Sequence, residues 1–243
     1  MKNFKILFAV IFLIAVSSCK KDRHFIKNDN VSPNDFLSSS KYDKLVVEVQ
    51  YMAGYQPSSA ALNRLTTLLQ ERLNKPDGIM ISQKSISAQG KAVYSSADVE
   101  AIEKAERTQN TKGNTLTAYI LFLDGDYSDN SGSSKVLGLT YANSSMVIFE
   151  KAVKDFSGGL SQPSTDVLES TVVNHEFGHV LGLVNNGTTM QSSHQSNGAH
   201  CNNKNCLMYY QAETSDIIGN LIGNNVPSFD SNCLNDLKGN GGK

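Results

Sequence analysis

The segment 172–183 has the sequence VVNHEFGHVLGL and places His175 and His179 four residues apart, with Glu176 directly after the first histidine. On a helix, residues four apart share one face, so both imidazoles would reach a single metal ion. Zinc binds neutral imidazole and keeps one coordination position open in catalytic sites. Glu176 would then accept a proton from a water that the metal makes acidic. The alternative is two core histidines satisfied by ordinary hydrogen bonds.

The surrounding pattern favours a metal. Apolar residues flank the histidines on several sides and predict a buried helix from near Ser164 to about Leu183. Buried imidazoles need partners, and a metal supplies them. Four of the five histidines of the chain lie between residues 175 and 200, which also indicates a site rather than scattered residues.

Gly182 extends the motif to His-Glu-x-x-His-x-x-Gly, which resembles the metzincin clan of zinc peptidases. In that clan the third ligand stands three residues after the glycine, where this chain has Asn185. Downstream, the order His200, Cys201, Cys206, Met208 resembles the His-Cys-x-x-x-x-Cys-x-Met motif of archaemetzincins. That resemblance implies His200 as third ligand after an insertion at 184–199. His194 is the competing candidate.

The same resemblance implies further roles. It implies Met208 as an apolar base beneath one catalytic zinc, and Tyr210 as a group that could stabilise a developing oxyanion. Archaemetzincins hold a second zinc through further cysteines, but this chain lacks their later Cys-x-x-Cys, so that site is not carried over.

The upstream pattern predicts an α+β fold. Apolar, β-branched runs predict strands over 44–51, 78–86, 116–123, 136–141 and 146–149. Helical spacing predicts one helix after Pro57 and another over 96–108. The metzincin resemblance implies a twisted mixed five-stranded sheet with backing helices, an active-site helix and a small irregular C-terminal subdomain. It also implies that the 136–141 strand is the sheet edge that binds extended substrates.

The N-terminus resembles a bacterial lipoprotein signal. Lys2 and Lys5 precede an apolar run over 6–16, and Val16, Ser17, Ser18 and Cys19 follow it. We expect cleavage before Cys19, a lipid on that cysteine and export to the cell envelope, with an ordinary cleaved signal as the alternative. The domains expected are a signal peptide (1–18), a lipidated polar tether (19–40), an N-terminal subdomain (41–184) and a C-terminal subdomain (185–243).

Composition limits the partners. The 243 residues carry a net charge of −1, which gives no electrostatic reason to expect nucleic acid. Cys201, Cys206 and Cys233 would meet an oxidising environment after export, and either Cys201–Cys206 or Cys206–Cys233 could pair.

These features predict a lipid-anchored monomeric zinc endopeptidase that acts on proteins or peptides. One alternative is a non-catalytic binding lipoprotein of the same fold, and a weaker one is a zinc hydrolase of a non-peptide amide. The acid beside the first histidine, Glu176, favours an enzyme, because a binding module needs no base there.

Overall fold

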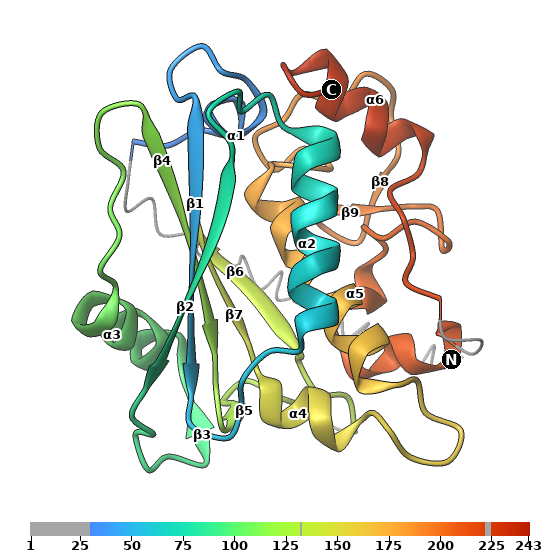
Figure 1. Cartoon of the computed structure of the whole chain (residues 1–243). Coiled ribbons are helices and arrows are strands. Elements are labelled where there is room, and N and C mark those ends of the chain that lie inside the picture. Colours follow the sequence, from blue (N-terminus) through green and yellow to red (C-terminus); the bar gives the residue numbers. More distant parts are fainter. Residues whose placement is uncertain (1–29, 132, 222–224) are drawn as a thin grey trace, which may run out of the picture.

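The structure is a computed structural model that describes residues 30–131, 133–221 and 225–243. Its centre is a five-stranded sheet in the order β2-β1-β4-β7-β6 (Figure 1). The first four strands in this order are parallel, and β6 runs antiparallel to β7. The strand bounds are β1 Lys44–Met52, β2 Ile79–Ile86, β4 Thr115–Phe122, β6 Gly138–Ala142 and β7 Ser145–Ile148. The predicted mixed sheet, with the strand near 136–141 at its edge, is confirmed.

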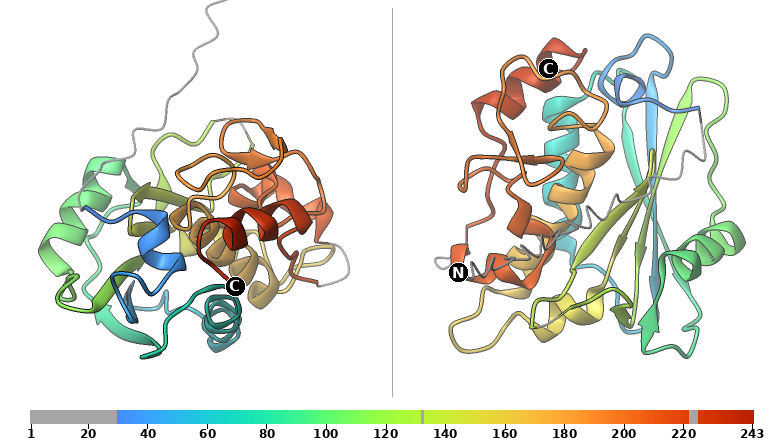
Figure 2. Two further views of the ribbon diagram at one scale, coloured as in Figure 1. Left: turned by 90° about the horizontal axis from the view of Figure 1, so that it is seen from above. Right: turned by 180° about the vertical axis from the view of Figure 1, so that it is seen from behind.

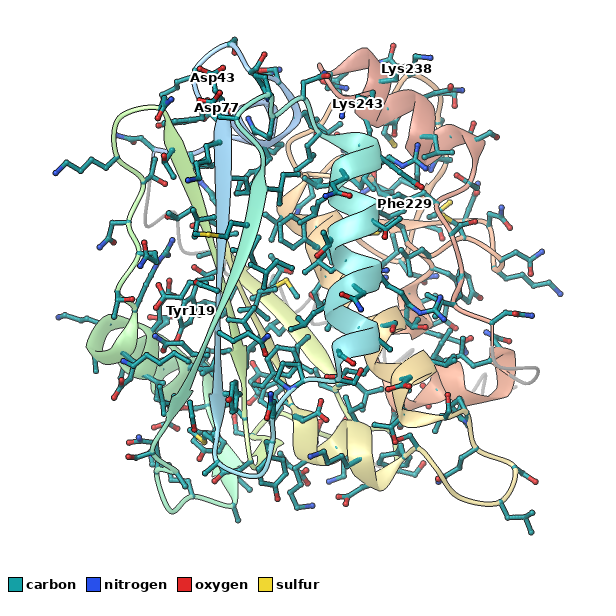
Figure 3. The ribbon with its side chains drawn as sticks, viewed as in Figure 1. Asp43, Asp77, Tyr119, Phe229, Lys238 and Lys243 are labelled. Atoms are coloured by element: carbon teal, nitrogen blue, oxygen red, sulfur yellow. The ribbon has the colours of Figure 1, made fainter. Side chains whose placement is uncertain are left out.

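One face of the sheet carries buried polar side chains that hold α3 (Ser96–Glu106). The Glu48 carboxylate accepts the backbone N–H of Thr108, just beyond the end of α3, at 3.0 Å. Tyr119 lies on this side of the sheet (Figure 3), and its hydroxyl donates to Gln50 at 2.8 Å. These bonds satisfy polar groups that would otherwise be costly to bury in a central strand.

The opposite face is covered by α2 (Ser59–Arg72) and α5 (Thr165–Val180), and the C-terminal part of the chain packs outside these helices (Figures 1 and 2). Serine hydroxyls at Ser58 and Ser164 cap the two helices by accepting N–H bonds from their first turns. Every residue of α5 from 167 to 180 is buried, because the helix lies between the sheet and the C-terminal part. The expected buried helix is therefore present.

Shorter elements complete the chain. They are α1 Pro33–Leu37, β3 Val93–Tyr94, β5 Asp126–Tyr127, α4 Glu150–Asp155, β8 Gln195–Ser196, β9 His200–Cys201, η1 Tyr210–Glu213, η2 Ser215–Asn220 and α6 Ser231–Gly239. β3 pairs with β5, and β8 pairs with β9 in a small hairpin. Over the described residues 185–221 and 225–243 the chain has only short elements, in agreement with the expected irregular C-terminal part.

The prediction of a polar tether up to residue 40 is wrong for its last part. Pro33–Leu37 form α1, and both Phe36 and Leu37 are fully buried. The Phe36 ring meets the Phe177 ring edge-on at 6.2 Å, so this segment packs on the zinc-motif helix. The buried Lys75 ammonium donates to the carbonyls of Asp35 and Tyr42. Two apolar side chains thus fix a segment whose overall composition is polar.

The predicted signal, the lipobox and the first part of the tether lie in residues 1–29, outside the described residues. Within the described ranges, no helix has the length and apolar character needed to cross a membrane.

Candidate metal centre

The α5 helix presents two imidazoles side by side. The rings of His175 and His179 lie 4.8 Å apart, and their Nε2 atoms are separated by 3.1 Å. His175 Nδ1 lies 2.7 Å from the carbonyl oxygen of Leu207. Because a carbonyl only accepts, Nδ1 is the protonated nitrogen of the neutral ring, and Nε2 carries a lone pair.

His200 brings a third imidazole from the other side. It begins β9, and its ring stacks on His175 at 5.4 Å and meets His179 edge-on at 5.0 Å. Its Nδ1 lies 2.7 Å from the carbonyl oxygen of Asn197, within the turn that joins β8 and β9. This bond likewise leaves the lone pair on Nε2, which faces the α5 histidines as one member of a group of potential ligand atoms.

The donor set fits a zinc ion. Tetrahedral nitrogen ligands about 2.0–2.1 Å from zinc lie about 3.3 Å from one another. The 3.1 Å between His175 Nε2 and His179 Nε2 matches this spacing. Among the described residues, the buried His200 Nε2 makes no hydrogen bond. Three imidazoles whose lone pairs converge would be unfavourable in an apolar core without a cation between them.

Glu176 lies on the same helix, directed toward the sheet edge. The Thr140 hydroxyl lies 2.9 Å from its Oε2 and 2.8 Å from its backbone oxygen, which ties the residue to β6. Gly138 leaves the room that the carboxylate needs, since a Cβ there would come within 2.7 Å of Glu176 Cγ. The position of this carboxylate is therefore set by the strand that borders the site.

Met208 packs against α5 at Gly178. A Cβ on Gly178 would come within 2.3 Å of Met208 Sδ, so only glycine allows this contact. The Met208 carbonyl accepts the N–H of Cys201 at 2.7 Å, which joins the turn to β9 and so to His200. Gly182, the glycine of the extended motif, has a φ of 74°, a backbone conformation that favours glycine, and the chain leaves α5 just before it.

Comparison with known proteins agrees with this geometry. Residues 46–221 match the family model Reprolysin_5, metallo-peptidase family M12. The chain belongs to metallopeptidase family M12. No curated protein sequence matches it.

Two solved structures align with this M12 metallopeptidase. Archaemetzincin from Methanopyrus kandleri aligns with a TM-score of 0.52 at 16% identity, over 83% of this chain and 96% of its own. A zinc-dependent peptidase from Methanocorpusculum labreanum aligns with a TM-score of 0.49 at 14% identity, over 79% and 99%. The likeness to archaemetzincin confirms the metzincin-like architecture, and the family together with the imidazole cluster identifies the cofactor as zinc.

Tyr210 begins η1, two residues after Met208 in the M12 chain. Its half-buried ring packs against Tyr209 with 4.6 Å between centroids. A hydrogen bond with Tyr209 raises the pKa of Tyr210 above the ordinary tyrosine value. The neighbouring tyrosine thus engages the ring, and the expected oxyanion role of Tyr210 stays a prediction.

Glu213 is a site residue that the sequence analysis missed. Its side chain is buried, and its Oε2 lies 3.4 Å from His200 Nε2. It belongs with the three histidines to one group whose ligand atoms all lie within 4.8 Å of one another. The available sequence clue was weak: Glu213 is the first carboxylate after His200, but it belongs to no motif.

His194, the competing third ligand, lies elsewhere in the M12 chain. Its Nε2 lies 2.7 Å from Asp236 Oδ2, and both side chains are buried. It belongs to a second group with Cys201, Asp230 and Cys233, whose potential ligand atoms also lie within 4.8 Å of one another. The structure therefore brings His200, and not His194, to the α5 histidines.

The cysteines of the C-terminal part are free thiols. Of the two pairings left open, Cys206–Cys233 is the one whose sulfur atoms lie in hydrogen-bond contact, 3.6 Å apart. The hydrogen bond from Cys233 lowers the pKa of Cys206 to about 7, while burial raises that of Cys201 to about 12. Cys206 is therefore the most acidic of the three thiols.

Proposed function

We propose that His175, His179 and His200 ligate one catalytic zinc and that Glu176 acts as general base in the hydrolysis of peptide bonds within a chain. The observation that carries this proposal is the convergence of three imidazole ligand atoms, with Glu176 anchored on the neighbouring strand. When bound, zinc acts as a Lewis acid that polarises a carbonyl and makes water acidic near neutral pH.

The protein's own groups supply the proton transfers. Glu176 takes a proton from the attacking water and returns it to the amine that leaves, so the carboxylate is regenerated in each turnover. The Thr140 hydroxyl, 2.9 Å from Oε2, keeps the carboxylate in one orientation. The Leu207 carbonyl orients His175 in the same way through Nδ1.

Substrate binding is assigned to the outer edge of β6. This strand pairs with β7 on one side only in the central sheet. An extended peptide can add to such an edge through main-chain hydrogen bonds, which place its middle, rather than an end, across Glu176. Tyr210 is assigned to the oxyanion, a role that requires its hydroxyl to turn from Tyr209 toward the substrate.

The test compares Glu176→Gln with Asp166→Asn, a change of an exposed carboxylate on the same helix. Glu176→Gln should keep one zinc per chain and lower kcat/KM about 1,000-fold on an internally quenched peptide blocked at both ends. Asp166→Asn should behave as wild type. If zinc-loaded wild type cleaves neither blocked peptides nor an unfolded protein, the non-catalytic binding alternative replaces this proposal.

We also propose that the protein is exported and held at the cell envelope, as a monomer, by a lipid on Cys19. The support is the sequence alone: a basic start, an apolar run and the small residues before Cys19. Cells that express the full chain with a clickable fatty acid should label the wild type and not Cys19→Ala. Equal labelling of both proteins would contradict the anchor.

A further inference from the structure

A buried carboxylate, that of Glu213, lies beside the three histidines of the candidate zinc site. Glu213 is only 5% exposed, and its Oε2 lies 3.4 Å from His200 Nε2. It shares the 4.8 Å group with His175 and His179 as well. Carboxylate oxygens bind zinc at about 2.0–2.2 Å, and ligands of one tetrahedral ion lie about 3.3 Å apart. The distance to His200 matches that spacing.

The backbone around Glu213 is fixed against the strand segment that leads into β6. The Leu137 N–H donates to the Glu213 carbonyl at 2.8 Å, and the Ser215 N–H donates to the Lys135 carbonyl at 2.8 Å. Thr214 and Val136 form an antiparallel bridge between these bonds. The segment 213–215 therefore pairs with residues 135–137, directly before β6, as an added strand would.

We propose that Glu213 is a fourth protein ligand of the zinc, so that the conformation described here is a latent one. The inference rests on the proposed function, because the same three histidines supply the other ligands. Catalytic zinc sites keep one position open, whereas sites with four protein ligands are closed. With Glu213 in place, neither water nor a substrate carbonyl reaches that position.

The pairing of segment 213–215 also indicates how the site opens. A peptide that extends along β6 toward Val136 competes with this segment for the backbone groups of Lys135 and Leu137. When the peptide takes those bonds, the short η1 turn is released and withdraws the Glu213 carboxylate. Substrate binding then opens the zinc site. A peptide long enough to reach Lys135 and Leu137 should therefore be cleaved faster than a short one.

The test measures metal binding, not only turnover, in Glu213→Gln and in the control Asp216→Asn, an exposed carboxylate three residues away. By competition with a chromophoric chelator, zinc affinity should fall about 10- to 100-fold in Glu213→Gln and stay unchanged in Asp216→Asn. The visible spectrum of the cobalt-substituted protein should change in Glu213→Gln and stay as in wild type in Asp216→Asn. Cleavage of a short peptide by zinc-saturated Glu213→Gln should exceed that of wild type.

Unchanged affinity and an unchanged cobalt spectrum in Glu213→Gln would overturn the inference, whatever the activity. If that variant does not fold, a crystal structure of the zinc-loaded wild type decides: Glu213 within about 2.2 Å of zinc supports it, and Glu213 turned away overturns it. Failure of the proposed function looks different: wild type would then bind no zinc at the three histidines, or zinc-saturated wild type and Glu213→Gln would both leave blocked peptides and an unfolded protein uncleaved.

Discussion

Two regions meet at the zinc site, and different forces hold the proposed ligands of each region in place. In the sheet region, residues 44–183, the proposed ligands His175 and His179 stand on a helix that is buried along 167–180. In the C-terminal region, residues 185–243, His200 stands on a two-residue strand. Apolar packing fixes the first pair, whereas His200 is held by the bond between its Nδ1 and the Asn197 carbonyl at 2.7 Å and by the backbone bond from Cys201 to Met208.

The C-terminal region also has specific polar contacts between residues far apart in the chain. Asp236 accepts the ring N–H of His194 at 2.7 Å and the Gln191 N–H at 2.6 Å. Asp230 accepts from the Asn203 side chain at 3.0 Å. The difference indicates that His175 and His179 are in place before metal binding. The position of His200 depends on individual hydrogen bonds and on the metal itself.

The largest expected effect is in the sheet region. Phe122→Ala removes a fully buried ring from β4 and should lower the free energy of unfolding by about 4 kcal/mol. Met80→Ala, at a position 48% exposed on β2, should change it by less than about 0.5 kcal/mol. Chemical denaturation of the zinc-loaded proteins measures both. Equal effects would contradict the view that packing holds this region.

A somewhat smaller and more local effect is expected at Asp236. Asp236→Ala leaves the buried His194 ring and the Gln191 N–H without their acceptor, which should cost about 3 kcal/mol. Hydrogen exchange should accelerate in residues 189–206 while β1 and β4 stay protected. The control is Asp216→Ala, an exposed residue of the same region. Uniform loss of protection over both regions would show that they do not differ as described.

Gly178→Ala acts at the junction of the two regions. The new Cβ would come within 2.3 Å of Met208 Sδ and 3.2 Å of Phe229, so the buried Met208 side chain, or the turn that carries it, must shift. We expect a loss of about 2 kcal/mol and weaker zinc binding, because the turn also carries the Leu207 carbonyl that orients His175. In Gly219→Ala no atom of the described residues beyond its chain neighbours lies within 4 Å of the new Cβ, so thermal melting should be unchanged. Wild-type zinc affinity in Gly178→Ala would contradict the coupling.

A pH dependence, rather than a fixed loss of stability, is expected within the sheet region. Burial first, and then the nearby Glu169, raise the pKa of Glu150 from 4.5 to about 9. The folded state therefore holds this proton where the unfolded state has released it, and stability falls as pH rises between these two values. Glu150→Gln should lose this dependence. Its melting temperature, compared with that of wild type, should therefore rise from pH 5 to pH 9. Parallel pH profiles for the two proteins would exclude the shift.

Much of the sheet region could be predicted because its signals are local. The β-branched run of β1, the leucine spacing of α2 and the paired histidines of α5 each mark their own element. The sheet edge came from the metzincin resemblance. The packing of Phe36 on Phe177 was missed, since two apolar residues in a polar stretch carry no periodic pattern.

The C-terminal region could be predicted only in part. His200 followed from its spacing to Cys206 and Met208, but nothing local separated it from His194 as strongly as the fold does. Glu213 was missed because its place in the site depends on the bridge between Thr214 and Val136, a contact between residues far apart in the chain. A motif search finds ligands with fixed spacing and overlooks those that only tertiary contacts bring in.

The central claim is that His200 from the C-terminal region completes the site on α5. The most direct measurement is zinc bound per chain after dialysis in wild type, His179→Ala, His200→Ala and His194→Ala. The account predicts that the catalytic zinc is held by wild type and His194→Ala and is lost in His179→Ala and in His200→Ala alike. If His200→Ala keeps the zinc that His194→Ala loses, the third ligand is assigned to the wrong residue.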